Sequence, residues 1–377
     1  MIGKNLTLRA LNRATLSRQG LLARAHVTPQ EMIARLAGLQ AQSARAPFVG
    51  LWSRLAGFRR EDLSRLIAEG AVVKATLMRA TLHLATAQDY FWMRPAVQPA
   101  LTAAAAQIAR TRKTAEFDRA AVLAAARDYL AAAPRTYAEL TQMLSSRFPD
   151  KDAGAMRYAV RTHLPLVQLP TDALWCYPGK PAWTPAQSWL GAPVSTDATA
   201  DRAQNLVLRY LAAFGPATVK DFETWCRLSA TGSTFDALRP RLVTYSGPAG
   251  EELFDVPVDA VPGEKVPPLP DPETAAGPRF LPEFDNLLLS HRKRERFVPP
   301  AHRKKVFLPG LRVAPTVLVD GFVAATWKTE VKRGEATLTV EPFDSLELDS
   351  RRAVEAEAEA LVRFAEPRAK KVHIAVH

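Results

Sequence analysis

The feature that most constrains this chain is an order of predicted elements that occurs three times. Each unit has a helix, a second helix opened by a threonine cap, one or two further helices, and a β-hairpin. A threonine followed three positions later by an acidic residue is the capping-box pattern of a helix N-terminus. The three pairs are Thr28 with Glu31, Thr136 with Glu139, and Thr218 with Asp221. The units differ too much in sequence to be a sequence repeat, so only the order of elements recurs.

The predicted elements divide into these units as follows. In the first unit we expect helices at 6–18, 28–39, 48–56 and 61–69, and strands at 72–77 and 81–85. In the second we expect helices at 117–132, from 136, and at 153–162, and strands at 166–169 and 174–177. In the third we expect helices at 202–213, from 218, and at 233–239, and strands at 242–245 and 252–256. This order is that of a winged-helix module, so three tandem winged-helix modules are predicted.

The pattern changes to strands in the last third of the chain. Residues 257–278 are rich in proline and acidic residues and predict a linker or an extended crossover. Asp320-Gly321 predicts a tight turn between strands at 316–319 and 322–331. Lys332-Arg333-Gly334 predicts the next turn, and a strand at 336–340, a helix at 346–364 and a strand at 372–376 follow. We therefore expect an α+β fold with a C-terminal β-rich segment, divided at 1–114, 115–195, 196–262 and 263–377.

Positive charge is concentrated in two parts of the chain. The 377 residues carry a net charge of +12. Residues 1–114 contribute +12 and residues 278–333 contribute +7, while the intervening and final segments are acidic. Two basic blocks favour a polyanionic partner, most simply a nucleic-acid backbone. The alternative is a solvated, arginine-rich surface with no partner.

Other classes of protein are disfavoured by composition. Two cysteines, Cys176 and Cys226, give neither a disulfide framework nor a cysteine metal site, and they suit a reducing compartment. No membrane-spanning run, signal peptide, metal-ligand spacing or glycine-rich phosphate loop is evident. We therefore expect a cytoplasmic, nucleoid-associated monomer without a metal, a cofactor or a membrane partner.

A pair of glutamines lies near the predicted end of the second helix. Gln40-Ala41-Gln42 places two amides two residues apart, so both cannot point into a core, and at least one should face solvent or a ligand. A polar helix end that satisfies only its own backbone is the alternative.

Several stretches resemble the AlkZ/YcaQ superfamily of winged-helix DNA glycosylases. They are LTLRALNRATLSRQGLL, GLQAQSARAPFVGLWSRL, MRATLHLATAQDY, RFLPEFDNLLLSHRKR and VLVDGFVAATW, in that order along nearly the whole chain. The family's catalytic signature is a glutamine, an apolar residue, and then glutamine or aspartate. Gln40-Ala41-Gln42 matches its Gln/Gln form.

The resemblance implies a fold, a substrate and a site. It implies three winged helices that form a C-shaped, basic, DNA-binding surface. It also implies hydrolysis of the N-glycosidic bond of N7-alkylguanine, including both arms of an azinomycin-type interstrand crosslink, for self-resistance and DNA repair. The partner would be duplex DNA that carries alkylated guanine or crosslinks. Gln40 and Gln42 would be catalytic, holding the attacking water and the sugar.

Basic residues outside the motif are candidates for DNA contact. The family uses a β-hairpin to enter the DNA near the lesion, and the turn at Lys332-Arg333-Gly334 is the best candidate for it. The full set of DNA-binding candidates is Arg45, Arg79, His83, Arg292, Lys293, Arg294, Arg303, Lys304, Lys332 and Arg333. Asp285 fits a helix or turn cap better than a catalytic acid. A solvated charge run and a structural histidine are the alternatives for these positions.

Two other functions would also explain the charge and the modules. A winged-helix transcriptional regulator would bind a specific sequence, usually as a dimer on a palindrome, and would release no base. A drug-sequestering resistance protein would bind the antibiotic without DNA. Release of free base separates the glycosylase from both.

Overall fold

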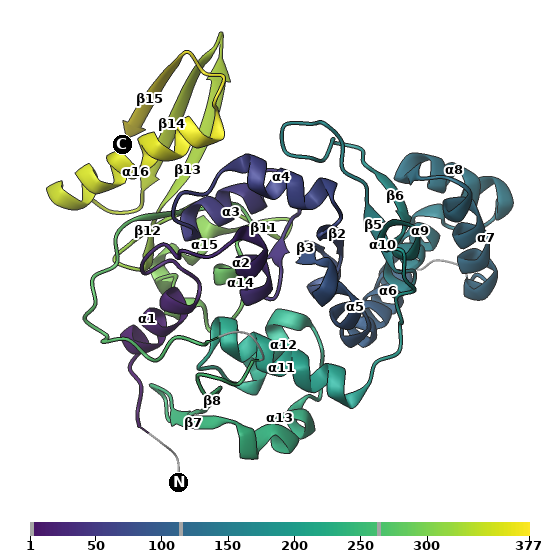
Figure 1. Cartoon of the computed structure of the whole chain (residues 1–377), viewed down its shortest axis with the longest axis horizontal. Coiled ribbons are helices and arrows are strands. Elements are labelled where there is room, and N and C mark those ends of the chain that lie inside the picture. The colour runs from purple at the N-terminus through teal and green to yellow at the C-terminus, as the bar shows by residue number, and fades with distance from the viewer. Residues whose placement is uncertain (1–3, 113–115, 262–264) are drawn as a thin grey trace.

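Threonine caps open the second helix of each unit, as predicted. The computed structural model describes residues 4–112, 116–261 and 265–377 (Figure 1). In each unit the threonine hydroxyl accepts the N–H of the acidic residue, whose carboxylate accepts the threonine N–H. Each pair of bonds satisfies two backbone donors that would otherwise lack partners, and so fixes where the helix begins.

The first unit has the predicted helices and hairpin. Its helices are α1 (Leu8–Arg18), α2 (Pro29–Arg35), α3 (Ala46–Arg54) and α4 (Arg60–Ala68). Its hairpin consists of β2 (Val72–Thr76) and β3 (Leu82–Thr86), joined by the 3₁₀ turn η1 (Met78–Ala80). The helices α5 (Ala87–Ala96) and α6 (Gln98–Arg112) then lead to the second unit.

The second unit corrects one strand prediction. Its elements are α7 (Arg119–Ala132), β4 (Arg135–Thr136), α8 (Tyr137–Arg147), α9 (Ala153–His163), β5 (Leu166–Gln168), β6 (Ala182–Pro185) and α10 (Ala186–Leu190). The predicted strand at 174–177 is wrong, because β5 pairs with β6. Cys176 has a φ of 63°, and its carbonyl accepts the Thr171 N–H at 2.7 Å, so the chain turns there. The apolar side chains of Cys176 and Tyr177 pack into the core of the first unit.

One sheet joins the first two units. Its strand order is β1-β3-β2-β5-β6-β4, where β1 (Leu39–Gln40) is an edge strand. The junction is the antiparallel pairing of β2 with β5, which sets Lys74 opposite Gln168 and Ala75 opposite Val167. The two units therefore share backbone hydrogen bonds and cannot move independently without breaking them.

The third unit keeps its own small sheet. Its elements are α11 (Ala200–Phe214), α12 (Val219–Cys226), α13 (Gly232–Leu238), η2 (Arg239–Arg241), β7 (Val243–Ser246) and β8 (Glu252–Asp255). Helix α1 ties this unit to the first, because the buried Arg18 guanidinium donates to both carboxylate oxygens of Asp255, at 2.6 and 2.8 Å.

The last third of the chain has the predicted strands and helix. Its elements are β9 (Arg279–Leu281), α14 (Asn286–Leu289), η3 (Arg294–Arg296), η4 (Pro300–His302), α15 (Arg303–Val306), β10 (Phe307–Leu308), β11 (Arg312–Val313), β12 (Thr316–Val319), β13 (Phe322–Lys332), β14 (Glu335–Pro342), α16 (Leu348–Ala365) and β15 (Lys371–Val376). The main sheet has the order β15-β14-β13-β12-β9. Asp320, Gly321, Arg333 and Gly334 all have positive φ, as two-residue hairpin turns require.

This C-terminal region packs against the first unit. Helix α16 buries Val354, Ala358, Leu361 and Val362, as its apolar pattern predicted. Asp285 caps α14 and forms a buried bidentate ion pair with Arg54, at 2.7 and 2.9 Å, which confirms it as a cap. The strands β13, β14 and β15 project from the body of the molecule at the top of the view (Figure 1).

Candidate active site

The glutamine pair lies on a sheet edge, so its predicted position at a helix end is wrong. Helix α2 ends at Arg35, and Ala37 and Gly38 then take φ values of 50° and 89°. These left-handed residues turn the chain into β1, where Gln40 lies opposite His83 of β3. The Gly38 turn approaches the Leu84 carbonyl closely enough that an added Cβ would lie 3.0 Å from its oxygen.

Gln40 is almost fully buried and its amide orientation is fixed. Its Oε1 accepts a hydrogen bond from Nη2 of Arg79 at 2.5 Å. A guanidinium can only donate, so the oxygen and nitrogen of this amide are assigned by the network itself. Asn286 secures the backbone, because it donates to the Gly38 carbonyl at 2.7 Å and accepts the Gln40 N–H at 3.3 Å.

Gln42 is exposed and more loosely held. Its Oε1 accepts the Leu82 backbone N–H at 3.3 Å, and this donor again identifies the oxygen. The prediction that at least one of the two amides faces solvent is confirmed. A carbonyl oxygen has two lone pairs, so the Gln42 oxygen can accept a second hydrogen bond from water or a ligand.

His83 is buried next to this network. Its Nδ1 lies 3.1 Å from the Thr81 carbonyl and its Nε2 lies 3.4 Å from Nη2 of Arg79. The carbonyl requires a proton on Nδ1 and the guanidinium requires a free Nε2, so the ring is neutral. Burial, and then the charge of Arg79, lower the pKa of His83 to about 3. This ring supports Arg79 and is not exposed to solvent.

Arg79 connects the first unit to the third. It lies in η1 with a φ of 56°, and its Nη1 donates to the Trp225 carbonyl of α12 at 2.6 Å. Burial, followed by the charge of Arg294, lowers the pKa of the Arg79 guanidinium to about 9. The group therefore stays positively charged at neutral pH while it holds the Gln40 oxygen.

Arg45 lies on the other side of the motif, before α3. Its Nη1 donates to Glu366 at 3.0 Å, and its guanidinium lies 6.0 and 5.9 Å from the ring centres of Trp175 and Trp327. Burial lowers the pKa of Arg45. These contacts hold the start of α3 against α16 and β13, with about a quarter of the Arg45 side chain exposed (27%).

Only part of the basic stretch after α14, residues 291–305, is exposed to solvent. Arg292, Lys293, Arg303 and Lys304 are exposed, as expected for a DNA-contacting surface. His291 and Arg296 instead turn inward and are buried. Nη1 of the Arg296 guanidinium lies 2.8 Å from Nε2 of the His291 ring. Burial lowers the pKa of His291 to about 3, with Arg296 as the next cause.

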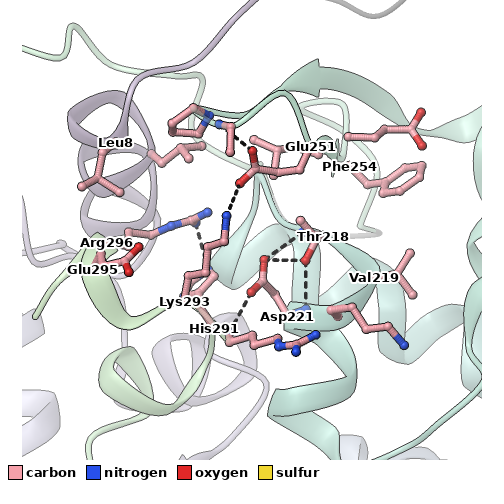
Figure 2. A pocket seen from close by; sticks show the side chains of 17 residues that line it. Leu8, Thr218, Val219, Asp221, Glu251, Phe254, His291, Lys293, Glu295 and Arg296 are labelled. Carbon is pink, nitrogen blue, oxygen red and sulfur yellow. Dashed lines mark hydrogen bonds and ion pairs between the residues drawn. The ribbon is translucent and has the colours of Figure 1, made fainter. Parts of the chain in front are cut away.

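A cavity of about 750 Å³ lies beside this stretch. Asp221 accepts hydrogen bonds from Thr218 and from the Arg292 backbone N–H, and Lys293 lies 3.2 Å from Glu251. Figure 2 shows Asp221 beside Thr218 and Lys293 beside Glu251. The lining residues come from α1, the start of α12, β8 and the basic stretch, and include neither glutamine. The cavity is therefore separate from the glutamine site.

Lys332 and Arg333 are exposed at the tip of the β13–β14 hairpin. Lys332 pairs with Glu330 at 2.7 Å. Across 4–112, 116–261 and 265–377, no group of His, Cys, Asp and Glu side chains could hold a metal ion. In the same ranges, no helix combines the length and apolar character needed to cross a membrane.

Sequence reasoning missed two residues near the site. Asn286 follows Asp285 in a stretch already singled out, but nothing local showed that its amide would reach Gly38. Arg227 follows α12 with a φ of 65° and lies near Arg79, which is 148 positions earlier in the chain. Only the tertiary fold brings these residues to the motif.

The chain is similar to known proteins over nearly its whole length. The family model of the AlkZ-like DNA glycosylases matches residues 33–364. An interstrand DNA cross-link repair glycosylase of Streptomyces sahachiroi is 28% identical over 372 residues, covering 92% of this chain and 94% of the relative. The solved structure of the Streptomyces sahachiroi DNA glycosylase AlkZ shares the fold, with a TM-score of 0.78, 22% identity, and coverage of 99% of this chain and 100% of that chain. The chain therefore belongs to the AlkZ-like DNA glycosylase family, as the resemblance predicted.

Proposed function

We propose that this protein is a monofunctional DNA glycosylase that hydrolyses the N-glycosidic bond of N7-alkylguanine. Its substrates would include azinomycin-type interstrand crosslinks, and its role would be self-resistance and DNA repair. The relative from Streptomyces sahachiroi, named as a cross-link repair glycosylase, supports this assignment. The observation that carries the proposal is the glutamine pair, whose side-chain oxygens accept hydrogen bonds from a guanidinium and from a backbone amide.

The substrate explains why glutamines suffice where most glycosidases use two carboxylates. Alkylation at N7 makes guanine cationic, so the C1′–N9 bond can break with its electron pair going to a purine that leaves neutral. No general acid is then needed. Water adds to C1′ and releases a proton to solvent, and the protein's task is to place that water and to stabilise the positively charged sugar.

The two glutamines would divide this task. Gln42 is exposed, and its oxygen keeps a lone pair for the attacking water, because the Leu82 N–H occupies only one of its two lone pairs. The Gln40 oxygen is held by Arg79, so Gln40 presents its amide N–H groups and would contact the sugar–phosphate backbone. This refines the expectation that both glutamines hold water and sugar alike.

The rest of the chain would bind the duplex. We propose that the units 1–114, 115–195 and 196–262 are winged-helix modules that form a C-shaped basic surface, with 263–377 supplying the hairpin. A protein monomer would act on the duplex, and Arg292, Lys293, Arg303 and Lys304 would contact phosphates. Their exposure on one stretch beside the third unit supports this placement.

The experiment is single-turnover release of base from a duplex with one N7-methylguanine. Gln42→Ala and Gln40→Ala should each lose at least about tenfold in rate while still binding DNA, the scale of a lost charged or water-positioning hydrogen bond. Gln107→Ala, at an exposed glutamine on α6, is the matched control and should keep the wild-type rate. Uracil and hypoxanthine should not be released, because their leaving groups would be anionic.

Two results would count against the assignment. Wild-type rates in both glutamine variants would remove the motif from catalysis. No base release by the wild-type protein, together with tight binding to undamaged DNA, would favour a winged-helix regulator.

A further inference from the structure

Three arginines from distant parts of the chain lie close enough for two of them to influence the third, Arg79, which holds the Gln40 oxygen. Arg79 lies in η1, Arg227 directly follows α12, and Arg294 begins η3. Arg79 donates to the Trp225 carbonyl, two residues before Arg227. The Arg294 guanidinium donates to the Leu288 carbonyl at 2.7 Å and lies 5.4 Å from the ring centre of Phe307. We call these three residues the arginine cluster.

The cluster has no carboxylate partner within the described part of the chain. The side chains of Arg79 and Arg294 donate to carbonyls and an amide, and Arg227 is exposed without an ion pair. The carboxylate that raises the pKa of Arg294, against the larger effects of burial and of Arg303, is that of Asp221. Its oxygens are already engaged by Thr218 and by the Arg292 backbone N–H. Among the other buried arginines, Arg18 is neutralised by Asp255 and Arg54 by Asp285. Arg94 and Arg296 donate to neutral groups, as the cluster does.

The charges of the cluster repel one another. Arg294 and Arg227 both lower the pKa of Arg79, and Arg303 lowers that of Arg294, in each case after the larger effect of burial. The pKa values, about 9 for Arg79 and about 10 for Arg294, leave both groups charged at neutral pH. Desolvated like charges are costly unless an anion neutralises them. Planar guanidinium groups match the geometry of phosphate oxygens.

The position of the cluster matters for the chemistry at Gln40. Arg79 holds a fixed positive charge against the Gln40 oxygen, at 2.5 Å. Release of a base leaves positive charge on the sugar, and an uncompensated guanidinium nearby would raise the energy of that state. An anion bound at the cluster would reverse this effect.

We propose that the arginine cluster binds one phosphodiester of the lesion-bearing strand, and that this phosphate offsets Arg79 and stabilises the positively charged sugar. The inference rests on the proposed glycosylase function. It adds a ligand, a DNA phosphate, and a new binding residue, Arg227. Gln40 then links the phosphate site to the reacting sugar.

The first test measures binding to undamaged duplex DNA over a range of salt concentrations. Arg227→Gln should reduce the slope of log K against log salt by about 1, the loss of one phosphate contact. Arg227→Lys, which keeps the charge, should retain most of the slope. The control Arg352→Gln removes an exposed arginine of α16 that pairs only weakly with Asp349 at 3.9 Å, and it should leave the slope unchanged.

The second test replaces single phosphates around the lesion with neutral methylphosphonates. In the wild-type protein, one position should lower the rate of base release by about tenfold, the scale of a charge-assisted hydrogen bond. In Arg294→Gln and in Arg227→Gln the same replacement should have little further effect, because the contact is already lost. Arg227 is exposed, so its variant tests the site even if Arg294→Gln is unstable.

The outcomes separate this inference from the proposed function. Base release by the wild-type protein, with an unchanged salt slope in Arg227→Gln and equal methylphosphonate effects in all variants, would overturn the phosphate site alone. No base release by the wild-type protein would overturn the glycosylase proposal and the catalytic role of the phosphate. The salt slope on undamaged DNA would still decide whether the cluster binds a phosphate.

Discussion

Two positively charged regions of this protein differ in how their charge is compensated. In the arginine cluster, Arg79 and Arg294 are partly buried and make no ion pair among the described residues. In the arm formed by β13, β14 and β15, exposed lysines pair with neighbouring glutamates. These pairs are Lys328 with Glu341 at 3.1 Å, Lys332 with Glu330 at 2.7 Å, and Lys371 with Glu335 at 3.2 Å.

The difference separates two ways of acting on DNA. An exposed ion pair contributes only about 0–1 kcal/mol to stability, so these lysines stabilise the fold little. Because each of them is paired with a glutamate, they also add little net positive charge. We therefore expect the arm to act mainly through its shape, because it projects from the body of the molecule (Figure 1). The cluster offers uncompensated charge at a fixed place beside Gln40. We expect substitutions to affect chemistry in the cluster and access to the substrate in the arm.

The largest effect should come from Arg79→Met, which removes the fixed donor to Gln40. Loss of a charged hydrogen bond that orients an active amide corresponds to about 1.5–3 kcal/mol, or roughly 10- to 150-fold in the single-turnover rate. DNA affinity should fall much less, because the exposed basic residues remain. Arg79→Lys should recover little, since one ammonium cannot hold both Gln40 and the Trp225 carbonyl as the guanidinium does.

Arg161→Met is the matched control for Arg79→Met. Arg161 donates to the Ala80 carbonyl at 2.8 Å, in the same turn, but does not contact Gln40. If Arg79 only supported the turn, both variants would lose rate and melting temperature together. A selective rate loss in Arg79→Met identifies a positioning role, and equal losses in both would contradict it.

A second prediction concerns how the free energy of unfolding depends on pH through two buried histidines, His83 and His291. The pKa values of His83 and His291 are about 3 in the folded protein, against about 6.5 when unfolded. Below pH 6.5 the unfolded chain therefore binds protons that the folded chain excludes. The contribution of the two neutral histidines to the free energy of unfolding is fully present above about pH 6.5. It is lost as pH falls toward 3, by about 1.4 kcal/mol per pH unit for each histidine.

Chemical denaturation at pH 7.0, 6.0 and 5.5 measures this dependence. His83→Asn should reduce the slope of the free energy of unfolding against pH by the contribution of one histidine. His373→Asn replaces an exposed histidine of the arm, 3.4 Å from Glu335, and should leave the slope unchanged. A wild-type stability that does not change between pH 7.0 and 5.5 would contradict the neutral, buried state of these rings. Base release should likewise show no step near pH 6.5 from His83.

The comparison also shows what the sequence can and cannot predict. Local signals were sufficient for the capped helices at Thr28, Thr136 and Thr218 and for the turns at Asp320-Gly321 and Arg333-Gly334, because caps and turns depend on neighbouring residues. The arm was therefore predictable strand by strand, including β15.

The parts that failed depend on contacts between distant residues. Residues 174–177 have strand-like composition, but Trp175, Cys176 and Tyr177 pack against the core of the first unit. Gln40 was expected at a helix end because the apolar spacing of α2 continues to Leu39, whereas Ala37 and Gly38 break the helix with left-handed backbone. The motif itself came from the family resemblance. Its partners Arg79 and Asn286 carry no local sign that they meet it, and neither Asn286 nor Arg227 was predicted.

The smallest effects are expected in the arm, where charge and shape can be tested separately. Lys332→Gln with Arg333→Gln removes the tip charge and should change base release from N7-methylguanine by less than about twofold, as exposed pairs contribute little. Deleting two rungs, Val331 with Ala336 and Lys332 with Glu335, keeps the Arg333-Gly334 turn but shortens the hairpin. This should slow unhooking of an interstrand crosslink by about tenfold, because a misplaced positioning element costs rate without removing a reacting group.

The shape and charge explanations predict opposite rankings of these two variants. The two-rung deletion preserves the alternation of faces along β13 and β14, so Trp327 and Leu338 should stay buried and the melting temperature should change little. If shape matters, the deletion impairs crosslink unhooking more than release of N7-methylguanine, and the charge variant impairs neither. If Lys332→Gln with Arg333→Gln slows crosslink unhooking more than the deletion does, the arm acts through its charge. The contrast with the arginine cluster then fails. Because Lys332 is already paired with Glu330, we would assign such a loss to Arg333, whose exposed side chain makes no ion pair among the described residues.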